Sequence, residues 1–422
     1  MDETKRILIL TSDTGFGHRS AANAIAAALQ KMHAPNCVTE IVNPLDDERT
    51  PAFLRDSQAD YDNLVRETPE FHRLSYNFSD NMLPNAIVEN ALTVMLFRIL
   101  RDLFQRFKPD VVVSTSNLFP APVSAVIAVM DLEIPAFTVV TDLADVHLAW
   151  LHEGADMILL PTRAAHTQAL HNKIPKEKLV VTGIPVYPCL VEETRSPAEI
   201  RATMGWDPDL TTILVVGSKR VNNLESVLHI LNHSGLPMQM VIVTGGDETL
   251  YQALLDTKWH RGVYLYNFVD NMPDFLKAAD CVISKAGGMI VTESLACGLP
   301  MLLIDVTPGQ EEGNAEYVVK NGAGELGRSP IEALEVLCHW LENDQLLLSE
   351  YHEKALRIGR PRSAFTAADL IWSAAGHTSH LVTVDRPALL PRFLDLLRNF
   401  DIDSGRKPAD IKEAQDRESR VS

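Results

Sequence analysis

The chain has 422 residues, 46% of them hydrophobic and 22% charged, a composition typical of globular proteins and unlike that of disordered or collagen-like chains. Because this length exceeds that of a usual single domain, we expect two domains with separate hydrophobic cores. The formal net charge of −18 repels polyanions, so the composition disfavours nucleic acid as a partner.

The cysteines and the hydropathy pattern favour a cytoplasmic protein. The cysteines are odd in number and lack CxxC spacing, which favours buried thiols in a reducing compartment over disulfides or a zinc site. They are Cys37, Cys189, Cys281, Cys297 and Cys338. The sequence has no apolar run of about 18 residues, so no transmembrane helix is predicted, and its N-terminus lacks the layout of a signal peptide.

Short β-rich runs alternate with helical stretches in both halves of the chain. The first series comprises residues 6–10, a helix at about 19–32, and residues 39–43, 111–115, 137–141 and 157–161. The second comprises residues 212–217, 240–245, 263–268, 281–285 and 301–305. Continuous apolar strands separated by helices are typical of parallel sheets covered on both faces. The sequence therefore predicts an α/β protein with two doubly wound, Rossmann-like parallel sheets.

Prolines and charged residues interrupt this periodicity between residues 182 and 200, and we place the domain boundary there. The predicted division is residues 1–190, residues 191–380, and a C-terminal helix with a charged tail at 381–422, which we expect to be disordered from about Asp401. Facing domains of this type form a cleft where the carboxyl ends of both sheets converge. Chemistry is therefore expected in the strand-to-helix loops.

The loop after the first strand, residues 11–25, combines glycines with a histidine. Gly15 and Gly17 permit a tight turn at a helix start, and His18 beside them titrates near neutrality. Ser20 replaces the last glycine of a dinucleotide motif, and Asn43 stands where that motif needs an acidic residue. His18 either takes part in the chemistry of the site or is only a neighbour of the helix cap, and the motif alone does not distinguish these two roles.

Two loops of the second series carry groups suited to a nucleotide and a sugar. In residues 282–300, Gly287 and Gly288 open a helix whose N-terminus offers its dipole and free N–H groups to a diphosphate, and Glu293 is placed to accept hydrogen bonds from ribose hydroxyls. In residues 305–324, a polar cluster suits sugar hydroxyls: Gln310, Glu311 and Asn314. The alternatives are an ordinary turn with a surface glutamate and a polar helix cap.

A further loop, residues 140–156, is rich in histidine and aspartate. The residues in question are Asp142, Asp145, His147, Trp150 and His152. Their spacing matches no compact metal motif, so we expect no metal there.

Several motifs together resemble the monogalactosyldiacylglycerol synthase and diacylglycerol glucosyltransferase family over roughly residues 6 to 345. The segments that carry the resemblance are residues 11–25, 62–77, 139–150, 181–186, 284–305 and 308–324. The resemblance implies a GT-B fold in which the C-terminal domain holds a UDP-sugar, UDP-glucose or UDP-galactose, and the N-terminal domain meets a diacylglycerol-type lipid acceptor. The implied reaction is inverting hexosyl transfer in glycolipid biosynthesis. No metal or cofactor is implied, because the UDP-sugar is a substrate.

The resemblance also implies residue roles. His18 matches the group that serves the acceptor hydroxyl, as base or orienting partner, and Asp142 is its partner or its substitute. Donor binding is implied for Gly217, Lys219, Phe268, Val269, Gly287, Gly288, Met289, Glu293, Gln310, Glu311 and Asn314. Acceptor binding is implied for Gly15, Phe16, Gly17, His147 and Trp150.

Two loops depart from the family pattern. The loop at 215–224 has only Gly217 where plant-type members are glycine-rich; Lys219 and Arg220 either contact the phosphates in its place or mark an altered donor geometry. Phe16 stands where glycine is common. Two alternatives to hexosyl transfer to diacylglycerol therefore stay open: an N-acetylglucosaminyltransferase acting on an isoprenoid-linked acceptor, and a catalytically silent protein that binds a UDP-sugar or lipid.

Residues 91–108 have an apolar helical face and a local charge of +3, from Arg98, Arg101, Arg106 and Lys108 against Asp102. This helix either lies on an anionic membrane surface or packs on the sheet as a crossover, and its periodicity favours the crossover. The stretch at 53–83, with Phe71, Tyr76 and Phe78, is a second candidate for acceptor or membrane contact. We expect a cytoplasmic protein that associates peripherally with the inner face of the membrane.

Overall fold

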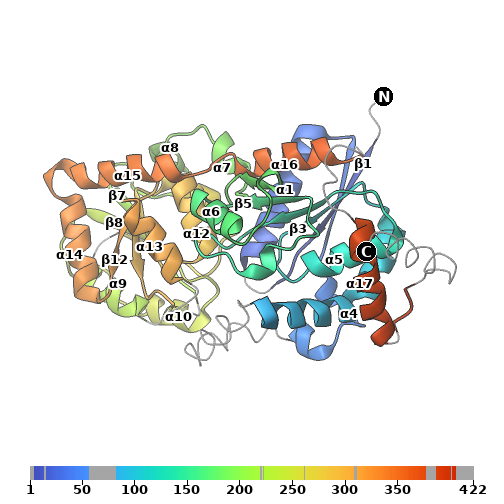
Figure 1. Ribbon diagram of the computed structural model, residues 1–422. Helices are drawn as coiled ribbons and strands as arrows, with labels where there is room; N and C mark the ends of the chain where they lie inside the picture. Colours follow the sequence, from blue (N-terminus) through green and yellow to red (C-terminus); the bar gives the residue numbers. More distant parts are fainter. Residues whose placement is uncertain are drawn as a thin grey trace. The chain divides into compact units, whose positions relative to one another are not determined.

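The computed structural model describes residues 4–13, 16–56, 82–218, 221, 223–260, 262–307, 311–376, 386–400 and 402–404 (Figure 1). These residues form two compact units. The first unit contains the chain up to Pro185 and the chain from Ala364 onward, and the second contains Val186–Ser363.

The first unit is built on a six-stranded parallel sheet with the order β2-β1-β3-β4-β5-β6. Its strands are β1 Lys5–Leu10, β2 Cys37–Val42, β3 Val111–Ser114, β4 Ala136–Val139, β5 Met157–Leu160 and β6 Leu179–Val181. In the β1–β3 pair, Ile7 and Ile9 of β1 lie opposite Val111 and Val113 of β3, and all four side chains are fully buried. Burial of successive residues explains why these strands are continuous apolar runs: helices cover both faces.

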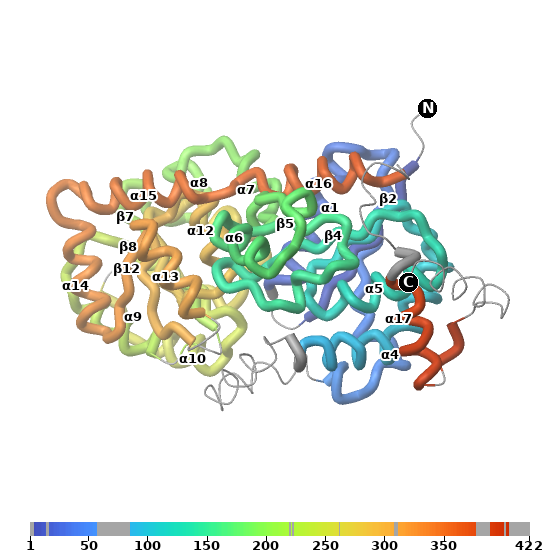
Figure 2. The backbone as a smooth tube through the Cα atoms, viewed as in Figure 1, coloured from blue at the N-terminus to red at the C-terminus, as the bar shows by residue number. Residues whose placement is uncertain are grey.

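The helices of the first unit are α1 Phe16–His33, α4 Met82–Phe107, α5 Pro120–Met130, α6 Arg163–His171, α17 Arg386–Asn399 and, from Ala364 onward, α16 Ser363–Ala374. Short 3-10 turns lie at Pro44–Asp46, Leu148–Trp150 and Lys176–Lys178. Figure 2 shows α4 and α17 side by side, although nearly 300 residues of sequence separate them. Helix α6 begins at a side-chain cap, since Thr162 accepts a hydrogen bond from the Ala165 N–H.

Helix α4 is a core helix of the first unit. Its apolar face packs with α5 and α17 into one hydrophobic cluster, contributing Leu92, Leu96, Phe97, Ile99, Leu100, Leu103, Phe104 and Phe107. Its polar rim is partly neutralised, since Arg106 pairs with Glu40 at 2.6 Å and Asp102 pairs with Arg49 at 2.6 Å. The packing therefore has the crossover arrangement that the periodicity favours.

The second unit repeats the architecture with the strand order β12-β11-β10-β7-β8-β9, again all parallel. Its strands are β7 Thr211–Val216, β8 Met238–Val243, β9 Val263–Tyr266, β10 Cys281–Ser284, β11 Met301–Ile304 and β12 Gly324–Gly327. Its helices are α7 Cys189–Glu192, α8 Pro197–Met204, α9 Leu224–Asn232, α10 Glu248–Leu255, α11 Met272–Ala278, α12 Gly288–Ala296, α13 Glu312–Lys320, α14 Pro330–Leu341 and α15 Leu346–Ile358, with a 3-10 turn at Asn343–Gln345.

The structure adds one edge strand to each predicted sheet. Neither β6 nor β12 was expected, because β6 has only three residues and β12 contains two glycines. Gly324 is required where β12 meets β11, since a Cβ there would lie 2.0 Å from the Met301 carbonyl oxygen. A residue type that usually marks a turn therefore permits strand pairing here.

The division of the chain also differs from the prediction at its C-terminal end. Residues 364–376, predicted to lie in the second domain, belong to the first unit because α16 packs against α1 and β1. The Trp372 ring stacks on His33 at 4.0 Å and 5°, and Lys5 Nζ donates to the Trp372 carbonyl at 2.9 Å. The first crossing lies between Pro185 and Val186, five residues before the predicted boundary.

The predicted C-terminal helix is present as α17, whereas most of the predicted tail lies outside the described residues. Helix α17 buries Leu390, Phe393 and Leu394 in the core of the first unit, and Ile402 packs against the same cluster. Residues 405–422 of the predicted tail, and residues 57–81 of the second acceptor candidate, lie outside the described residues.

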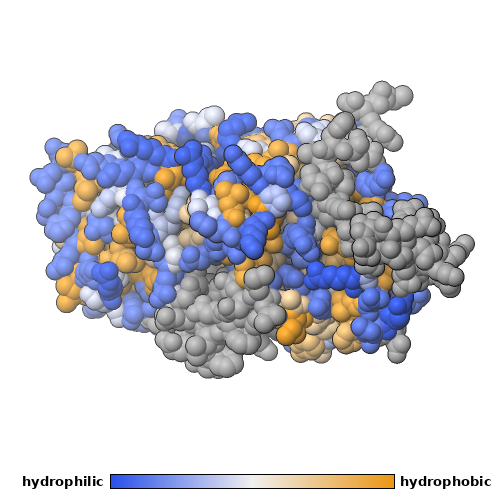
Figure 3. Space-filling view, in the orientation of Figure 1, coloured by the Kyte–Doolittle hydropathy of each residue, from blue (hydrophilic) through white to orange (hydrophobic). Residues whose placement is uncertain are grey.

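Among the described helices, none is long and apolar enough to cross a membrane. Figure 3 shows hydrophobic surface over the N-terminal part of α4, where Ile87 and Val88 are 70% and 44% exposed.

Candidate functional site

The first unit brings His18 together with the loop after β4. His18 lies in the first turn of α1, directly after β1, and its Nδ1 is 2.8 Å from the Thr141 hydroxyl. Thr115, which follows β3, donates a hydrogen bond to the His18 carbonyl at 3.0 Å. Because β3 lies between β1 and β4, three neighbouring strands deliver these groups to one edge of the sheet.

The environment of His18 keeps its imidazole neutral at physiological pH. Burial lowers its pKa to about 4, and the Thr115 backbone and the Asp13 charge only partly offset this effect. The contact with Thr141 fixes the ring plane, and Nε2 has a free lone pair in the tautomer in which Nδ1 donates to the Thr141 hydroxyl. This arrangement suits a group that accepts a proton or a hydrogen bond from a hydroxyl.

Trp150 links His18 to Asp142. The Trp150 indole is fully buried, donates to Asp142 Oδ2 at 2.6 Å, and lies 5.7 Å from the His18 ring between centroids. His147, three residues earlier in the same loop, is also buried and accepts a hydrogen bond from the Ala149 N–H. The structure therefore groups His18, Asp142 and Trp150, and uses His147 to cap the 3-10 turn that carries Trp150.

Sequence reasoning missed an ion pair beside His18. Arg19 donates to both oxygens of Asp13, at 2.8 and 2.7 Å, and Asn43 donates to Asp13 at 3.2 Å. The hydrogen bond from Arg19 lowers the pKa of Asp13, so a negative charge stays near His18. Asp13 could have been found from the sequence, because it stands three residues after an apolar strand. The position of Arg19 has no such feature.

In the second unit, the loop after β10 forms the predicted glycine turn. Gly287 is the N-cap of α12, with φ −66° and ψ 139°, and no side chain caps the helix. The first N–H groups of a helix, here including those of Gly288 and Met289, have no hydrogen-bond partner within the helix. They form a positive helix end of the kind that binds anions.

Glu293 lies on the same helix, about one and a half turns further on. Its side chain is partly buried, and burial alone raises the pKa of its carboxyl to about 7. No hydrogen bond or ion pair of this carboxyl is found within the described ranges. Such a carboxylate favours a hydrogen-bond donor from outside the chain.

The loop after β11 returns to the same glycine turn. Glu311, which is 4% exposed in its side chain, forms an ion pair with Lys285, and its other oxygen accepts from the Thr307 N–H at 3.1 Å. Asn314 donates to the Ala286 carbonyl at 3.0 Å. Lys285 was missed from sequence, because a lysine after a strand gives no signal by itself.

Other predicted donor residues lie in neighbouring loops of the second unit. Gly217 follows β7, and a Cβ there would lie 2.8 Å from the Leu224 side chain, so glycine fits the close approach to α9. Phe268 is 60% exposed and Val269 partly buried, both just after β9. Lys219, Gln310 and Gly15 lie outside the described residues; Phe16 and Gly17 begin α1.

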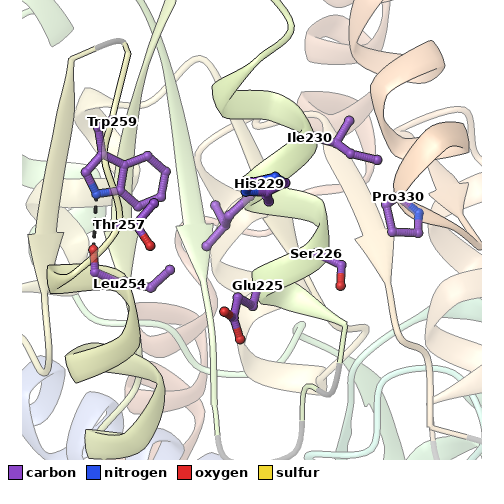
Figure 4. A pocket seen from close by; sticks show the side chains of 9 residues that line it. Glu225, Ser226, His229, Ile230, Leu254, Thr257, Trp259 and Pro330 are labelled. Carbon is purple, nitrogen blue, oxygen red and sulfur yellow. Dashed lines mark hydrogen bonds between the residues drawn. The ribbon is translucent and has the colours of Figure 1, made fainter.

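A pocket lies elsewhere in the second unit (Figure 4). It has a volume of about 530 Å³, and none of the described site residues lines it. Its lining is Glu225, Ser226, Leu228, His229, Ile230, Leu254, Thr257, Trp259 and Pro330. Within the described part of the chain, no group of three or more His, Cys, Asp or Glu residues is arranged to hold a metal ion.

Comparisons with known proteins agree with this arrangement. Residues 18–186 match the monogalactosyldiacylglycerol (MGDG) synthase family, and residues 212–344 match the glycosyltransferase family 28 C-terminal domain. Monogalactosyldiacylglycerol synthase 3, chloroplastic, of Arabidopsis thaliana is 29% identical over 86% of this chain and 80% of its own length.

Solved structures share the fold. MurG of Acinetobacter baumannii has a TM-score of 0.54 at 17% identity, covering 87% of this chain and 99% of MurG. The calicheamicin glycosyltransferase CalG4 has a TM-score of 0.56 at 16% identity, covering 90% of this chain and all of CalG4. The chain has two six-stranded parallel sheets with flanking helices, as these GT-B glycosyltransferases do, so its fold is GT-B. The chain is therefore a glycosyltransferase of GT-B fold that is similar to the monogalactosyldiacylglycerol synthases.

Proposed function

We propose that this glycosyltransferase moves a hexose, glucose or galactose, from a UDP-sugar to diacylglycerol or a related glycolipid acceptor, with inversion at the anomeric carbon. The second unit would bind the donor and the first unit the acceptor. The names of its relatives, which are monogalactosyldiacylglycerol synthases, support the lipid acceptor and the hexose.

The observation that carries the proposal is the combination on α12 of an uncapped N-terminus and a partly buried, unneutralised Glu293. A diphosphate matches the positive helix end, and ribose hydroxyls match the carboxylate. A nucleoside diphosphate carries both groups. Phe268 and Val269 would meet its base, and Glu311, Asn314 and Gln310 its sugar.

On the acceptor side, we assign proton acceptance to His18. The acceptor oxygen would attack the anomeric carbon as its proton passes to the imidazole, and the bond from that carbon to the diphosphate would break. A pKa near 4 keeps the ring unprotonated before the reaction, and Thr141 fixes its orientation. Asp142, which accepts from Trp150, would position the aromatic wall beside the imidazole.

We also propose that transfer needs no metal or cofactor, because the positive end of α12 faces the leaving diphosphate and stabilises its developing charge. For location, we propose a cytoplasmic enzyme that touches an anionic membrane surface from its inner face. The exposed Ile87, Val88 and Arg98 of α4 support this contact.

The test is transfer from labelled UDP-glucose, UDP-galactose and UDP-N-acetylglucosamine to diacylglycerol in anionic liposomes. We expect labelled glycolipid from one of the two hexose donors. Product from UDP-N-acetylglucosamine alone would favour the aminosugar transferase instead. Absence of product from all three donors, with UDP still bound by the protein, would contradict the proposed acceptor.

A further inference from the structure

Lys285 and Glu311 form an ion pair that the donor roles assigned above do not use. Lys285 follows β10 and Glu311 precedes α13, so two neighbouring strands of the second sheet deliver the two charges. Their side chains are 16% and 4% exposed, and the Lys285 ammonium donates to Glu311 Oε1. By contrast, the Lys320–Glu316 pair on α13 is 70% and 61% exposed.

A pair with so little exposure is poorly explained by stability. Removing two charges from water costs about as much as their attraction returns, so well-packed apolar residues serve a core equally well. Glu311 Oε2 is held by the Thr307 N–H at 3.1 Å, which anchors the carboxylate and leaves the lysine as the mobile partner. The pair therefore suggests a role in binding.

Both charges lie at the glycine turn that opens α12. The point where a Gly287 Cβ would stand is 3.7 Å from Lys285 Nζ and 3.8 Å from Glu311 Oε1. The absence of a side chain at Gly287 leaves this space next to the uncapped helix end. An anion at that end would therefore compete with Glu311 for the same ammonium.

We propose that Lys285 exchanges partners during donor binding: it pairs with Glu311 in the free enzyme and with the diphosphate when the donor is bound. This inference rests on the proposed function. The exchange supplies the diphosphate with a full positive charge in addition to the helix end. It also releases the Glu311 carboxylate, which can then accept hydrogen bonds from the hexose hydroxyls, so diphosphate binding prepares the sugar site.

Titration calorimetry of the full chain with UDP and with uridine tests the exchange. Lys285→Met should weaken UDP binding at least about tenfold, the loss expected for one charge-assisted hydrogen bond, and leave uridine binding unchanged. Glu311→Gln should strengthen UDP binding several-fold, because the competitor for Lys285 is gone, while slowing hexosyl transfer. Lys320→Met, which removes an equal charge from an exposed pair, is the matched control and should change neither affinity.

The direction in which each variant changes UDP affinity distinguishes partner exchange from a purely structural ion pair. Equal UDP affinity in Lys285→Met and the wild type would overturn the inference, as would weaker UDP binding in Glu311→Gln, which would make Glu311 only a support for the lysine. If Lys285→Met does not fold because Glu311 is left unpaired, the double variant Lys285→Met/Glu311→Gln replaces it and should bind UDP at least about tenfold more weakly than Glu311→Gln. A wild type that binds UDP no better than uridine would overturn the proposed donor site itself.

Discussion

His18 Nδ1 lies 2.8 Å from Thr141 Oγ1, a contact that ties the start of α1 to the loop after β4. The two residues are 123 positions apart in sequence, yet β1 and β4 are both neighbours of β3 in the sheet. The contact orients an imidazole that burial keeps neutral, with its pKa near 4. The first unit thus holds a neutral, oriented imidazole at the carboxyl ends of its strands.

Glu293→Gln should stabilise the protein while impairing donor binding. The folded-state pKa of about 7 is above the ordinary value of 4.5 for a glutamate, so ionising this carboxyl in the folded protein costs stability. The cost is absent below pH 4.5 and complete above pH 7. We expect a gain of about 2 kcal/mol at pH 8, none at pH 4.5, and UDP binding weakened about tenfold.

Urea unfolding at the two pH values and UDP titration measure these effects on one variant. A loss of stability at pH 8 together with unchanged UDP affinity would mean that Glu293 is a structural residue.

Acid should destabilise the first unit through His152. Its Nδ1 accepts from the Gly154 N–H at 3.0 Å, and burial lowers its pKa to about 4, with Arg392 and Lys178 adding to the effect. Because the folded-state pKa is depressed, this stability is present above pH 6.5 and is lost as the pH falls towards 4. His152→Gln should reduce the loss between pH 7.5 and pH 5 by about 1 to 2 kcal/mol. An identical pH dependence of urea unfolding in the variant and the wild type would contradict this assignment.

Arg201→Met should strongly destabilise the second unit. The buried guanidinium donates to the carbonyls of Ala278, Pro208 and Leu210 and pairs with Asp280 at 2.7 Å. Its loss leaves those acceptors without their donor, which we expect to cost about 3 kcal/mol. Chemical denaturation measures the change. Arg195→Met, which removes the exposed partner of Glu193, is the control and should cost far less stability.

Trp372→Ala should loosen α16 from the first unit. The ring stacks on His33 and lies under the Lys5 ammonium at 4.6 Å, so its removal costs packing and a cation–π contact. We expect a loss of about 2 kcal/mol in unfolding free energy, with UDP affinity unchanged because the proposed donor residues belong to the second unit. Unaltered stability would mean that this stack does not anchor the helix.

Much of the fold follows from local sequence. The apolar runs at β1, β3, β5 and β8 are so continuous that only strands buried on both faces fit them, and the alternation with helices gives parallel sheets. Edge strands are different. Glycine fits β12 because Met301 approaches Gly324 closely and Ala333 approaches Gly327, and these tertiary contacts are not contained in local strand propensity.

The site residues that could be predicted from the sequence are those in loops that directly follow strands. Gly287 and Glu293 are recognisable because a glycine turn and a helical spacing are local. Lys285 and the return of Trp372 to the first unit depend on partners 26 and 367 residues away, which no local pattern contains. The resemblance to a family gave the order of the motifs but not these contacts.

The most direct test of the account is hexosyl transfer to diacylglycerol in anionic liposomes by the wild type and by His18→Ala, with UDP affinity measured on both. The account predicts labelled glycolipid from the wild type, at least about a hundredfold slower transfer in the variant, the usual loss for a general base, and equal UDP affinity. Transfer by His18→Ala at near the wild-type rate would contradict it.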